Sequence, residues 1–504
     1  MAQSYHIGGL GDEYMRILQL QGKIDKNISF TSRPNFATDN ISQDSFYRLI
    51  DSNYHPLNYY DSKLFTFKPL MFNLIKKSNS TQPYGWNDDG MIKAKGLQTM
   101  TRWGAYTRFG PLSIQYMPED VKAENLPYEI GEDYGIITTN KYQRKFLGQS
   151  SVRLNLKSIS IGWSTENIWW GPGQYSSLLM SNNAPGFPHF TFNTTKPIIT
   201  KLGSFEWQLI TGRLNQDTSM PFENIYLRKN LNWNYSKIYN GLNFAFQPIF
   251  LKGFFIGINR SFQYTENLIP NTNNFVGNYI PVFSTLFKSE LGGAEDNIPR
   301  DQQLSVFSRW LFPKTHSEFY FEYGWNDHSY NFRDFWIDPQ HSSIYLVGFT
   351  NLVVLKNNKY LEIKAELIQA AQSTDYLVRN AYDWYQYPNG GYTHENQILG
   401  AGSGIGNNVQ TISFTWIKNF SKFGIKLQRI QNQPILAANE FPVETLGLRR
   451  YRWNDMSIGF NIQKKLFSRI IINSNFEFIN SINYAWMPVN TSNFFGTINL
   501  SYLW

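Results

Sequence analysis

The sequence predicts an all-β protein, a large antiparallel transmembrane β-barrel. Three observations lead to this fold: a carboxy-terminal strand with strictly alternating faces, similar segments along most of the chain, and an aromatic content of 17% in 504 residues. Successive side chains of a strand point to opposite sides, so strict alternation indicates two unlike surroundings. The wall of a membrane barrel has lipid on one side and a polar interior on the other.

The last eleven residues show the alternation most clearly. Trp504, Tyr502 and Leu500 belong to one set of side chains, and Ser501 and Asn499 belong to the other. A strand that ends on an aromatic residue resembles the closing strand of bacterial outer-membrane barrels, which the barrel-assembly machinery reads as an address. We therefore expect Leu500, Tyr502 and Trp504 to form an assembly signal.

Alternating segments recur through the rest of the chain. In each, one set of positions is mostly apolar or free of charge, and the other set includes polar or charged side chains; examples lie at 99–109, 152–157, 318–325, 361–367, 411–416 and 458–463. A membrane-spanning helix needs about 20 consecutive apolar residues. The sequence has no such run, because the best candidate, 241–259, contains Asn243, Gln247, Pro248 and Lys252. Strands rather than helices are therefore expected to cross the membrane.

The composition narrows the classes of partner and chemistry. The chain has no cysteine, which excludes disulfides and thiolate chemistry, and its seven histidines lack the i, i+4 spacing of a metal-binding helix. We therefore expect no metal and no cofactor. The formal net charge of +8 favours anionic partners such as acidic polysaccharide or the phosphates of lipopolysaccharide. Nucleic acid is not expected, because the basic residues form no compact stripe.

The amino-terminal region has a different pattern. Residues 11–22 and part of 40–54 place apolar side chains at helical spacing, and Gly22 is the expected stop of the first helix. We expect residues 1–64 to form a small helical plug at the periplasmic mouth and residues 65–504 to form a barrel of about 18 strands with infolded loops. A signal peptide is expected to have been removed or to lie outside this numbering.

Two internal stretches, 163–189 and 301–349, resemble the Wzi family of outer-membrane capsule-assembly proteins, in the form found in Bacteroidetes-type genomes. Segments 85–119 and 392–408 extend the resemblance over nearly the whole chain. Its most specific part is Trp169-Trp170-Gly171-Pro172, followed by Leu178-Leu179 and Asn182-Asn183-Ala184-Pro185.

The resemblance implies a monomeric 18-stranded barrel in the outer membrane, closed by an amino-terminal helical bundle and by infolded extracellular loops. It also implies a surface lectin that binds and retains capsular or exopolysaccharide, with outer-membrane lipids and lipopolysaccharide as its surroundings. Two alternatives stay open. One is a pore, or an accessory barrel recruited to an outer-membrane export or assembly complex. The other is a barrel-wall hydrolase, for which Ser403 is the residue to test, although no enzyme is expected.

Sugar rings pack their C–H faces on aromatic planes and bond through their hydroxyls to amides, carboxylates and guanidinium groups. Loop-like clusters of this composition give the candidate polysaccharide-binding residues Arg333, Asp334, Trp336, Asp338, Tyr382, Asp383, Trp384, Tyr385 and Tyr387. A second set is expected to pack inside the lumen as part of the plug, namely Trp169, Trp170, Gly171, Pro172, Asn182 and Asn183.

Overall fold

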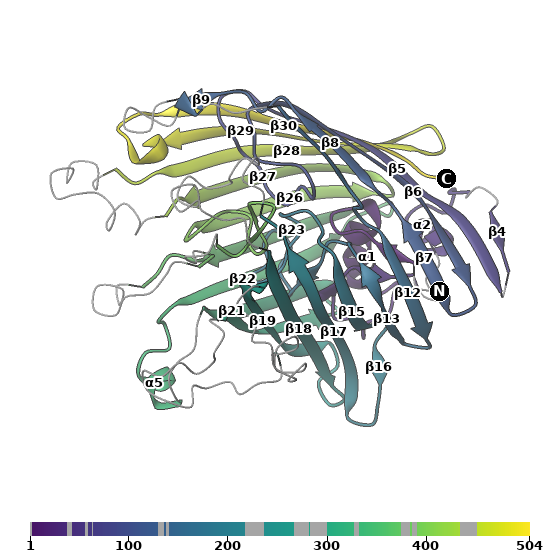
Figure 1. The fold of residues 1–504 in the computed structure, drawn as a ribbon. Coiled ribbons are helices and arrows are strands. Elements are labelled where there is room, and N and C mark those ends of the chain that lie inside the picture. Colours follow the sequence, from purple (N-terminus) through teal and green to yellow (C-terminus); the bar gives the residue numbers. More distant parts are fainter. Residues whose placement is uncertain are drawn as a thin grey trace.

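The computed structural model describes residues 3–37, 43–55, 59–62, 64–129, 136–137, 141–216, 236–266, 282, 300–326, 332–373, 384–385, 391–433 and 451–504. Its strands form one closed antiparallel barrel (Figure 1). Fifteen strands of the described wall are uninterrupted. They are β5 (Phe65–Asn79), β6 (Gly96–Phe109), β13 (Ile159–Ser164), β17 (Gly203–Leu214), β18 (Lys237–Pro248), β19 (Phe254–Thr265), β20 (Asp301–Phe312), β21 (Ser317–Asn326), β22 (Ser343–Val354), β23 (Tyr360–Gln369), β26 (Asn408–Lys418), β27 (Ser421–Gln431), β28 (Asn454–Leu466), β29 (Ile470–Ile482) and β30 (Thr491–Tyr502).

Three further wall strands are interrupted. Both β7 (Leu112–Tyr116) and β8 (Glu119–Ala123) pair with β6, and they face β12 (Ser151–Leu156) and β11 (Tyr142–Phe146). Both β15 (His189–Thr194) and β16 (Ile198–Ile199) pair with β17. With each such pair counted as one strand, and β4 (Tyr60–Asp61) as an extension beside β5, the described residues form an 18-stranded barrel. The predicted fold class is confirmed.

The carboxy-terminal strand closes the barrel. β30 pairs with β5 in the register from Phe495↔Asn79 to Tyr502↔Phe72. Its outward side chains keep much of their surface, with Phe494 50% and Ile498 45% exposed, whereas the inward Asn493 is 1% exposed. The outer surface of the wall is therefore apolar and the inner surface is polar, as the alternation predicts for a strand between lipid and lumen.

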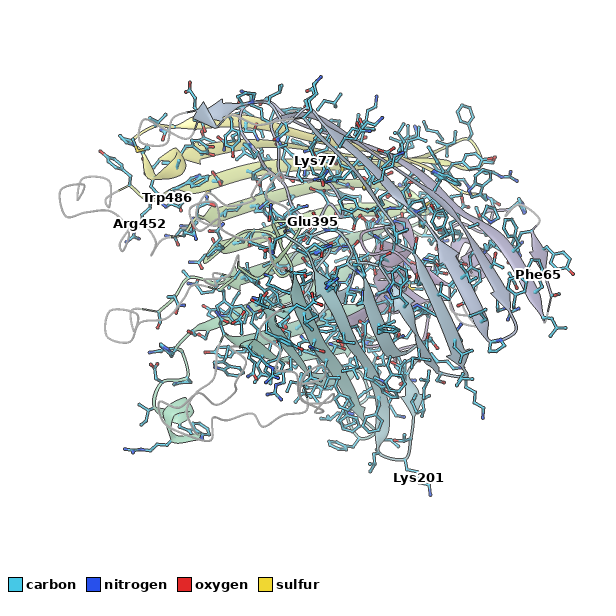
Figure 2. All side chains as sticks on the ribbon, in the orientation of Figure 1. Phe65, Lys77, Lys201, Glu395, Arg452 and Trp486 are labelled. Atoms are coloured by element: carbon cyan, nitrogen blue, oxygen red, sulfur yellow. The ribbon has the colours of Figure 1, made fainter. Side chains whose placement is uncertain are left out.

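The two ends of the barrel differ. Short turns such as 249–253 and 419–420 join strands at the end where both chain termini lie, and Lys201 lies at the tip of another turn there (Figures 1 and 2). The strand ends that are separated by longer stretches of sequence lie at the opposite end, near Arg452. Short turns are periplasmic and long loops are extracellular in outer-membrane barrels. The termini therefore mark the periplasmic end.

Two helices lie at this periplasmic end, α1 (Leu10–Leu20) and α2 (Gln43–Ile50), where the sequence predicts them. α1 ends in a Schellman motif, because the N–H groups of Gly22 and Lys23 donate to the carbonyls of Gln19 and Leu18, both at 2.9 Å. Gly22 has a φ of 71°, which a residue without Cβ adopts at no steric cost.

The helices pack against the lumen side of the wall strands, near their periplasmic ends. Their buried apolar side chains share one cluster with wall and turn residues such as Leu311, Phe420 and Leu503. None of the helices in the described parts of the chain has the length and hydropathy of a membrane-spanning helix. The boundary between a plug at 1–64 and a barrel at 65–504 stays a proposal, and β4 already pairs with the wall at Tyr60 and Asp61.

Small elements line the interior and the outer end of the barrel. The two-stranded sheets are β1 (Ser4–Tyr5) with β3 (Asn35–Phe36), β2 (Ser32–Arg33) with β14 (Trp169–Trp170), β9 (Tyr128–Glu129) with β10 (Ile136–Ile137), and β24 (Thr393–His394) with β25 (Gln397–Ile398). A short helix, α5 (Phe332–Ile337), and a 3-10 turn at Tyr484–Trp486 lie at the extracellular end (Figure 1).

Candidate functional site

The tryptophan pair of the most specific sequence segment lies inside the barrel. Trp169 and Trp170 form β14, which pairs with β2 of the amino-terminal segment, and they are 3% and 0% exposed. The Trp170 indole donates from Nε1 to Oε1 of Gln208 on the wall at 2.8 Å. The same ring fills the space beside Gly241, where a Cβ would lie 2.4 Å from Cη2. These contacts place the pair between the amino-terminal segment and the wall.

Gly171 and Pro172 continue this contact. Gly171 has a φ of 103°, and a Cβ there would lie 2.3 Å from Oε2 of Glu322, so only glycine fits without displacement. The Pro172 carbonyl accepts a hydrogen bond from the Arg16 guanidinium on α1 at 2.7 Å. The segment therefore joins α1 to the wall through backbone geometry as well as through its aromatic rings.

Asn182 and Asn183 connect the loops inside the barrel. The Asn182 amide donates to the carbonyl of Asn87 at 3.0 Å, and the Asn183 amide donates to that of Ile398, also at 3.0 Å. Both side chains are buried. These contacts agree with the lumen-packing role that we expect for the six residues of this set, and that role remains a proposal.

Buried ion pairs connect α1 to the wall. The Glu318 carboxylate accepts hydrogen bonds from Nε of Arg16 at 2.8 Å and from Nη2 of Arg309 at 2.5 Å. All three side chains are nearly inaccessible to solvent. On the other side of the helix, Lys422 of β27 bonds to Glu13 at 2.9 Å. Removing one partner of a buried pair typically costs about 3–5 kcal/mol, so the contact between Arg16 and Glu318 holds the helix in one position.

Two further carboxylates in the interior have opposite pKa shifts. Burial alone raises the pKa of Glu166, but the Arg153 guanidinium at 2.6 Å and hydrogen bonds from Ser4 and Ser164 outweigh burial, so its pKa lies below the ordinary value. Burial raises the pKa of Asp89 to about 7, against the charge of Arg102 and assisted by the nearby Glu119.

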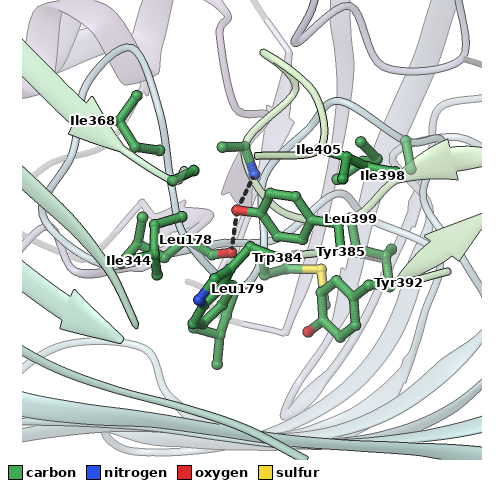
Figure 3. Packing of buried hydrophobic residues seen from close by; sticks show 14 of the residues in the cluster. Leu178, Leu179, Ile344, Ile368, Trp384, Tyr385, Tyr392, Ile398, Leu399 and Ile405 are labelled. Carbon is green, nitrogen blue, oxygen red and sulfur yellow. Dashed lines mark hydrogen bonds between the residues drawn. The ribbon is translucent and has the colours of Figure 1, made fainter. Parts of the chain in front are cut away.

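Trp384 and Tyr385, two of the candidate polysaccharide-binding residues, are buried and do not form a surface for polymer. They are 0% and 1% exposed and belong to the largest apolar cluster of the interior (Figure 3). The Trp384 indole donates to the Ser342 carbonyl at 2.8 Å, and the Tyr385 hydroxyl donates to the Leu178 carbonyl at 2.7 Å. A polymer outside the cell cannot reach these rings, because both are packed inside the barrel, where burial of their apolar surface is favourable.

The α5 segment remains at the surface. Trp336 is 68% exposed, Arg333 is exposed, and Asp338 is partly exposed. Just after the helix in the chain, the Pro339 carbonyl accepts hydrogen bonds from the Tyr323 hydroxyl and the Trp325 indole, both at 3.0 Å. These bonds attach the segment to the end of β21. We call Arg333, Trp336 and Asp338 the α5 patch.

The side chains of the other candidate residues are not described by the structure. Tyr382, Asp383 and Tyr387 lie outside the described residues, and for Asp334 the helix is described but the side chain is not. Their predicted binding role stays a prediction.

The aromatic terminus contacts both the wall and the amino-terminal segment. The Trp504 indole donates to the Leu70 carbonyl of β5 at 2.6 Å, and the Trp504 carbonyl accepts from the Tyr54 hydroxyl at 3.0 Å. Its ring packs edge-on against Tyr502, with the ring centroids 4.9 Å apart. The proposed assembly signal thus also joins the two ends of the barrel wall.

Sequence reasoning missed a cavity of about 450 Å³ in the lumen. It lies between α1, the loop 84–91 and the inner faces of β23 and β26–β30, and includes Trp86, Tyr175 and Asn475 in its lining. The available signal was the inner set of each alternating strand, which holds amides at Asn461, Asn473 and Asn475. Among the described residues, no group of three or more histidines, aspartates or glutamates is arranged to hold a metal ion.

Comparison with known families identifies the relationship. Residues 74–439 match the family model of Capsule assembly protein Wzi. The chain belongs to the Wzi family. The matched part of this Wzi-family chain includes the interior tryptophan segment, α5 and wall strands up to β27. The family and the closed barrel together show that this chain is an outer-membrane protein. No curated protein sequence matches the chain.

One solved structure has the same fold, and two others are less similar. Wzi of Escherichia coli, an outer-membrane protein of group 1 capsule assembly described as a carbohydrate-binding β-barrel, is 12% identical and has a TM-score of 0.64, with 100% of both chains covered. OccAB1 of Acinetobacter baumannii is 8% identical, with a TM-score of 0.43 and coverage of 88% of this Wzi-family chain and 99% of that one. OpdQ of Pseudomonas aeruginosa is 10% identical, with a TM-score of 0.41 and coverage of 87% and 98%.

Proposed function

We propose that this Wzi-family barrel is a surface lectin that binds capsular or exopolysaccharide and retains it on the cell. The observation that carries the proposal is the filled lumen of a capsule-assembly barrel. The amino-terminal segment, the tryptophan segment and the loop at 391–407 pack together inside the wall. A filled barrel is suited to presenting a surface rather than to passing a polymer. The carbohydrate binding of the Escherichia coli relative supports the same role.

The α5 patch is the part of the candidate site that polymer can reach. It combines an exposed indole with a guanidinium and a carboxylate at the extracellular end. An indole face packs on the C–H face of a sugar ring, and the charged groups bond to hydroxyls or to acidic substituents. The net charge of +8 favours an anionic polymer.

The role as an export pore or an accessory barrel of an export complex is the second candidate. The cavity of about 450 Å³ is the observation that favours it, because it leaves part of the lumen unfilled. The volume is that of a small-molecule site rather than of the water-filled channel of a porin. Catalysis is not part of the proposal, which assigns the barrel a binding role alone.

Gene deletion tests the proposed function. Loss of the protein should shift surface polysaccharide from the cell-bound fraction to the medium while total polysaccharide stays constant. Complementation with Trp336→Ala should restore less retention than the wild-type gene. Trp103→Ala is the matched control, because Trp103 is 60% exposed on the outer wall and away from α5. Unchanged retention after deletion would remove the lectin function, and lower total polysaccharide would favour the export role.

A further inference from the structure

The cavity inside the barrel has a wall of amides and hydroxyls. Asn461, Asn473, Asn475, Thr497 and Asn499 occupy inward positions, since they alternate along β28–β30 with lipid-facing apolar side chains. All five nevertheless keep intermediate exposure. The cavity that they line accounts for this exposure, so their polar groups are open to a small solute.

These amides retain hydrogen-bonding capacity. Nδ2 of Asn461 donates to Oδ1 of Asn473 at 2.9 Å and to Oδ1 of Asn475 at 2.5 Å. Nδ2 of Asn473, Nδ2 of Asn475 and Oδ1 of Asn461 have no partner in the described parts of the chain. A side-chain amide offers two donors and an acceptor with two lone pairs. The wall therefore presents free donors beside free acceptors, which is the pattern that sugar hydroxyls match.

The charged groups around the cavity are already paired. Lys422 bonds to Glu13 at 2.9 Å, Lys364 bonds to Glu362 at 3.1 Å, and Lys426 bonds to Glu477. An ionic ligand would have to compete with these pairs, in which the charges beside the cavity already neutralise one another. The pairing favours an uncharged ligand.

One end of the cavity is aromatic. Tyr84 and Trp86 contact each other edge-on, with centroids 5.7 Å apart, and Trp86 is partly exposed at the cavity. An aromatic ring next to amides combines a surface for sugar C–H groups with partners for hydroxyls. The inward positions of β27 that border the cavity run from Lys422 to Gln428, which corresponds to about 20 Å along the strand.

We infer that this cavity is an internal binding site for a short neutral saccharide of one to three sugar units. Its volume of about 450 Å³ lies within the range of small-molecule sites, roughly 300–1,000 Å³. The internal site is separate from the α5 patch. It stands if that patch proves not to bind polymer, and the experiment below uses soluble fragments so that the two outcomes are distinguishable.

The absence of native cysteine gives a direct test, because a single introduced thiol reports on one position. Thr497→Cys places a thiol at the cavity, and Ser468→Cys places one on the exposed short turn between β28 and β29. The rate of reaction with a small charged methanethiosulfonate is measured on the full chain in detergent. The probes are uncharged fragments of one to three sugars, prepared by partial hydrolysis of the producing bacterium's own surface polysaccharide.

Saturating fragments should slow the reaction of Thr497→Cys at least about fivefold and leave that of Ser468→Cys unchanged. Adding Asn475→Leu, which keeps the branched shape and removes the amide, should abolish this protection while the barrel stays heat-modifiable. Three results would each overturn the inference: a Thr497→Cys thiol that reacts only after unfolding, no slowing by the fragments, or equal slowing at both positions.

Discussion

Trp336 and Trp384 have the same side chain but opposite surroundings, with 68% and 0% of their surfaces exposed. Trp336 lies on α5 with most of its side chain at the surface. Trp384 packs in the interior and uses its N–H group to satisfy the Ser342 carbonyl. The difference in burial decides which of the two can bind polymer and which stabilises the fold.

Substitution of these residues should therefore separate stability from binding. Trp384→Ala should lower the free energy of unfolding by about 3–5 kcal/mol, because a large buried ring leaves a cavity behind. Trp336→Ala should change it by less than about 0.5 kcal/mol, as is usual at exposed positions. Urea unfolding of the barrel in lipid vesicles measures both values. Equal stability losses would contradict the assigned burial.

Asp89 should make stability depend on pH. Its pKa of about 7 in the folded chain exceeds the value of about 3.9 expected when unfolded, so the folded state binds a proton between these values. The resulting stabilisation is complete below about pH 4 and is lost as the pH rises through 7. Between pH 5 and pH 8 the free energy of unfolding should fall on the order of 2 kcal/mol from this group.

Asp89→Asn provides the matched variant for the pH measurement, because the amide cannot ionise. Its unfolding free energy should vary less between pH 5 and pH 8 than that of the wild type. Asp89 and Glu119 contact the same Arg102 guanidinium, with N···O distances of 2.6 and 2.8 Å. A wild-type profile that rises over this pH range would show that another group dominates.

At the scale of single elements, the closing strand has one face for lipid and one for the lumen. Ile498→Lys should cost about 2–4 kcal/mol, since the side chain lies in the middle of β30 on the lipid face, where lysine loses its hydration. Asn499→Lys should cost less, because the neighbouring position faces the cavity. Folding yield into vesicles and urea unfolding measure the contrast, and equal tolerance at both positions would contradict the assigned faces.

Deletion of Trp504 should reduce assembly into the outer membrane. The indole closes a hydrogen bond to β5 and the residue contacts Tyr54 of the plug, so some stability is lost as well. The assembly role predicts that the yield of membrane-inserted protein in cells falls more than the stability of protein refolded in vitro. A loss confined to stability would remove the proposed signal.

For the whole molecule, the filled interior predicts low conductance. In planar bilayers the wild-type barrel should not show the stable open steps of a wide pore. Trp169→Ala combined with Trp170→Ala should raise the frequency of conducting events or lower the yield of folded barrel, because both rings fill space between the plug and the wall. Stable wide-pore steps in the wild type would favour the channel alternative over the lectin.

The sequence predicted the strands, their faces, the strand number and both amino-terminal helices. These features follow from residues close to one another in the chain. Alternation along β12 or β30 indicates which side chains face lipid, and Gly22 ends α1 by its local backbone geometry. It also indicated the interior segment at Trp169 and Trp170 through a resemblance. The inward amides of β28 and β29 were a local signal for polar lining, but the cavity itself was not predicted, because its lining comes from strands and loops distant in sequence.

The direction in which each extracellular segment folds was decided only by the tertiary structure. Trp384 and Tyr385 sit in a stretch of aromatic and glycine residues whose composition suits an exposed loop and a buried plug equally well. Their positions depend on contacts with Ser342 and Leu178, which lie 42 and 207 residues away. Local pattern determines that a residue belongs to a strand or a loop, whereas burial depends on which distant surfaces meet it.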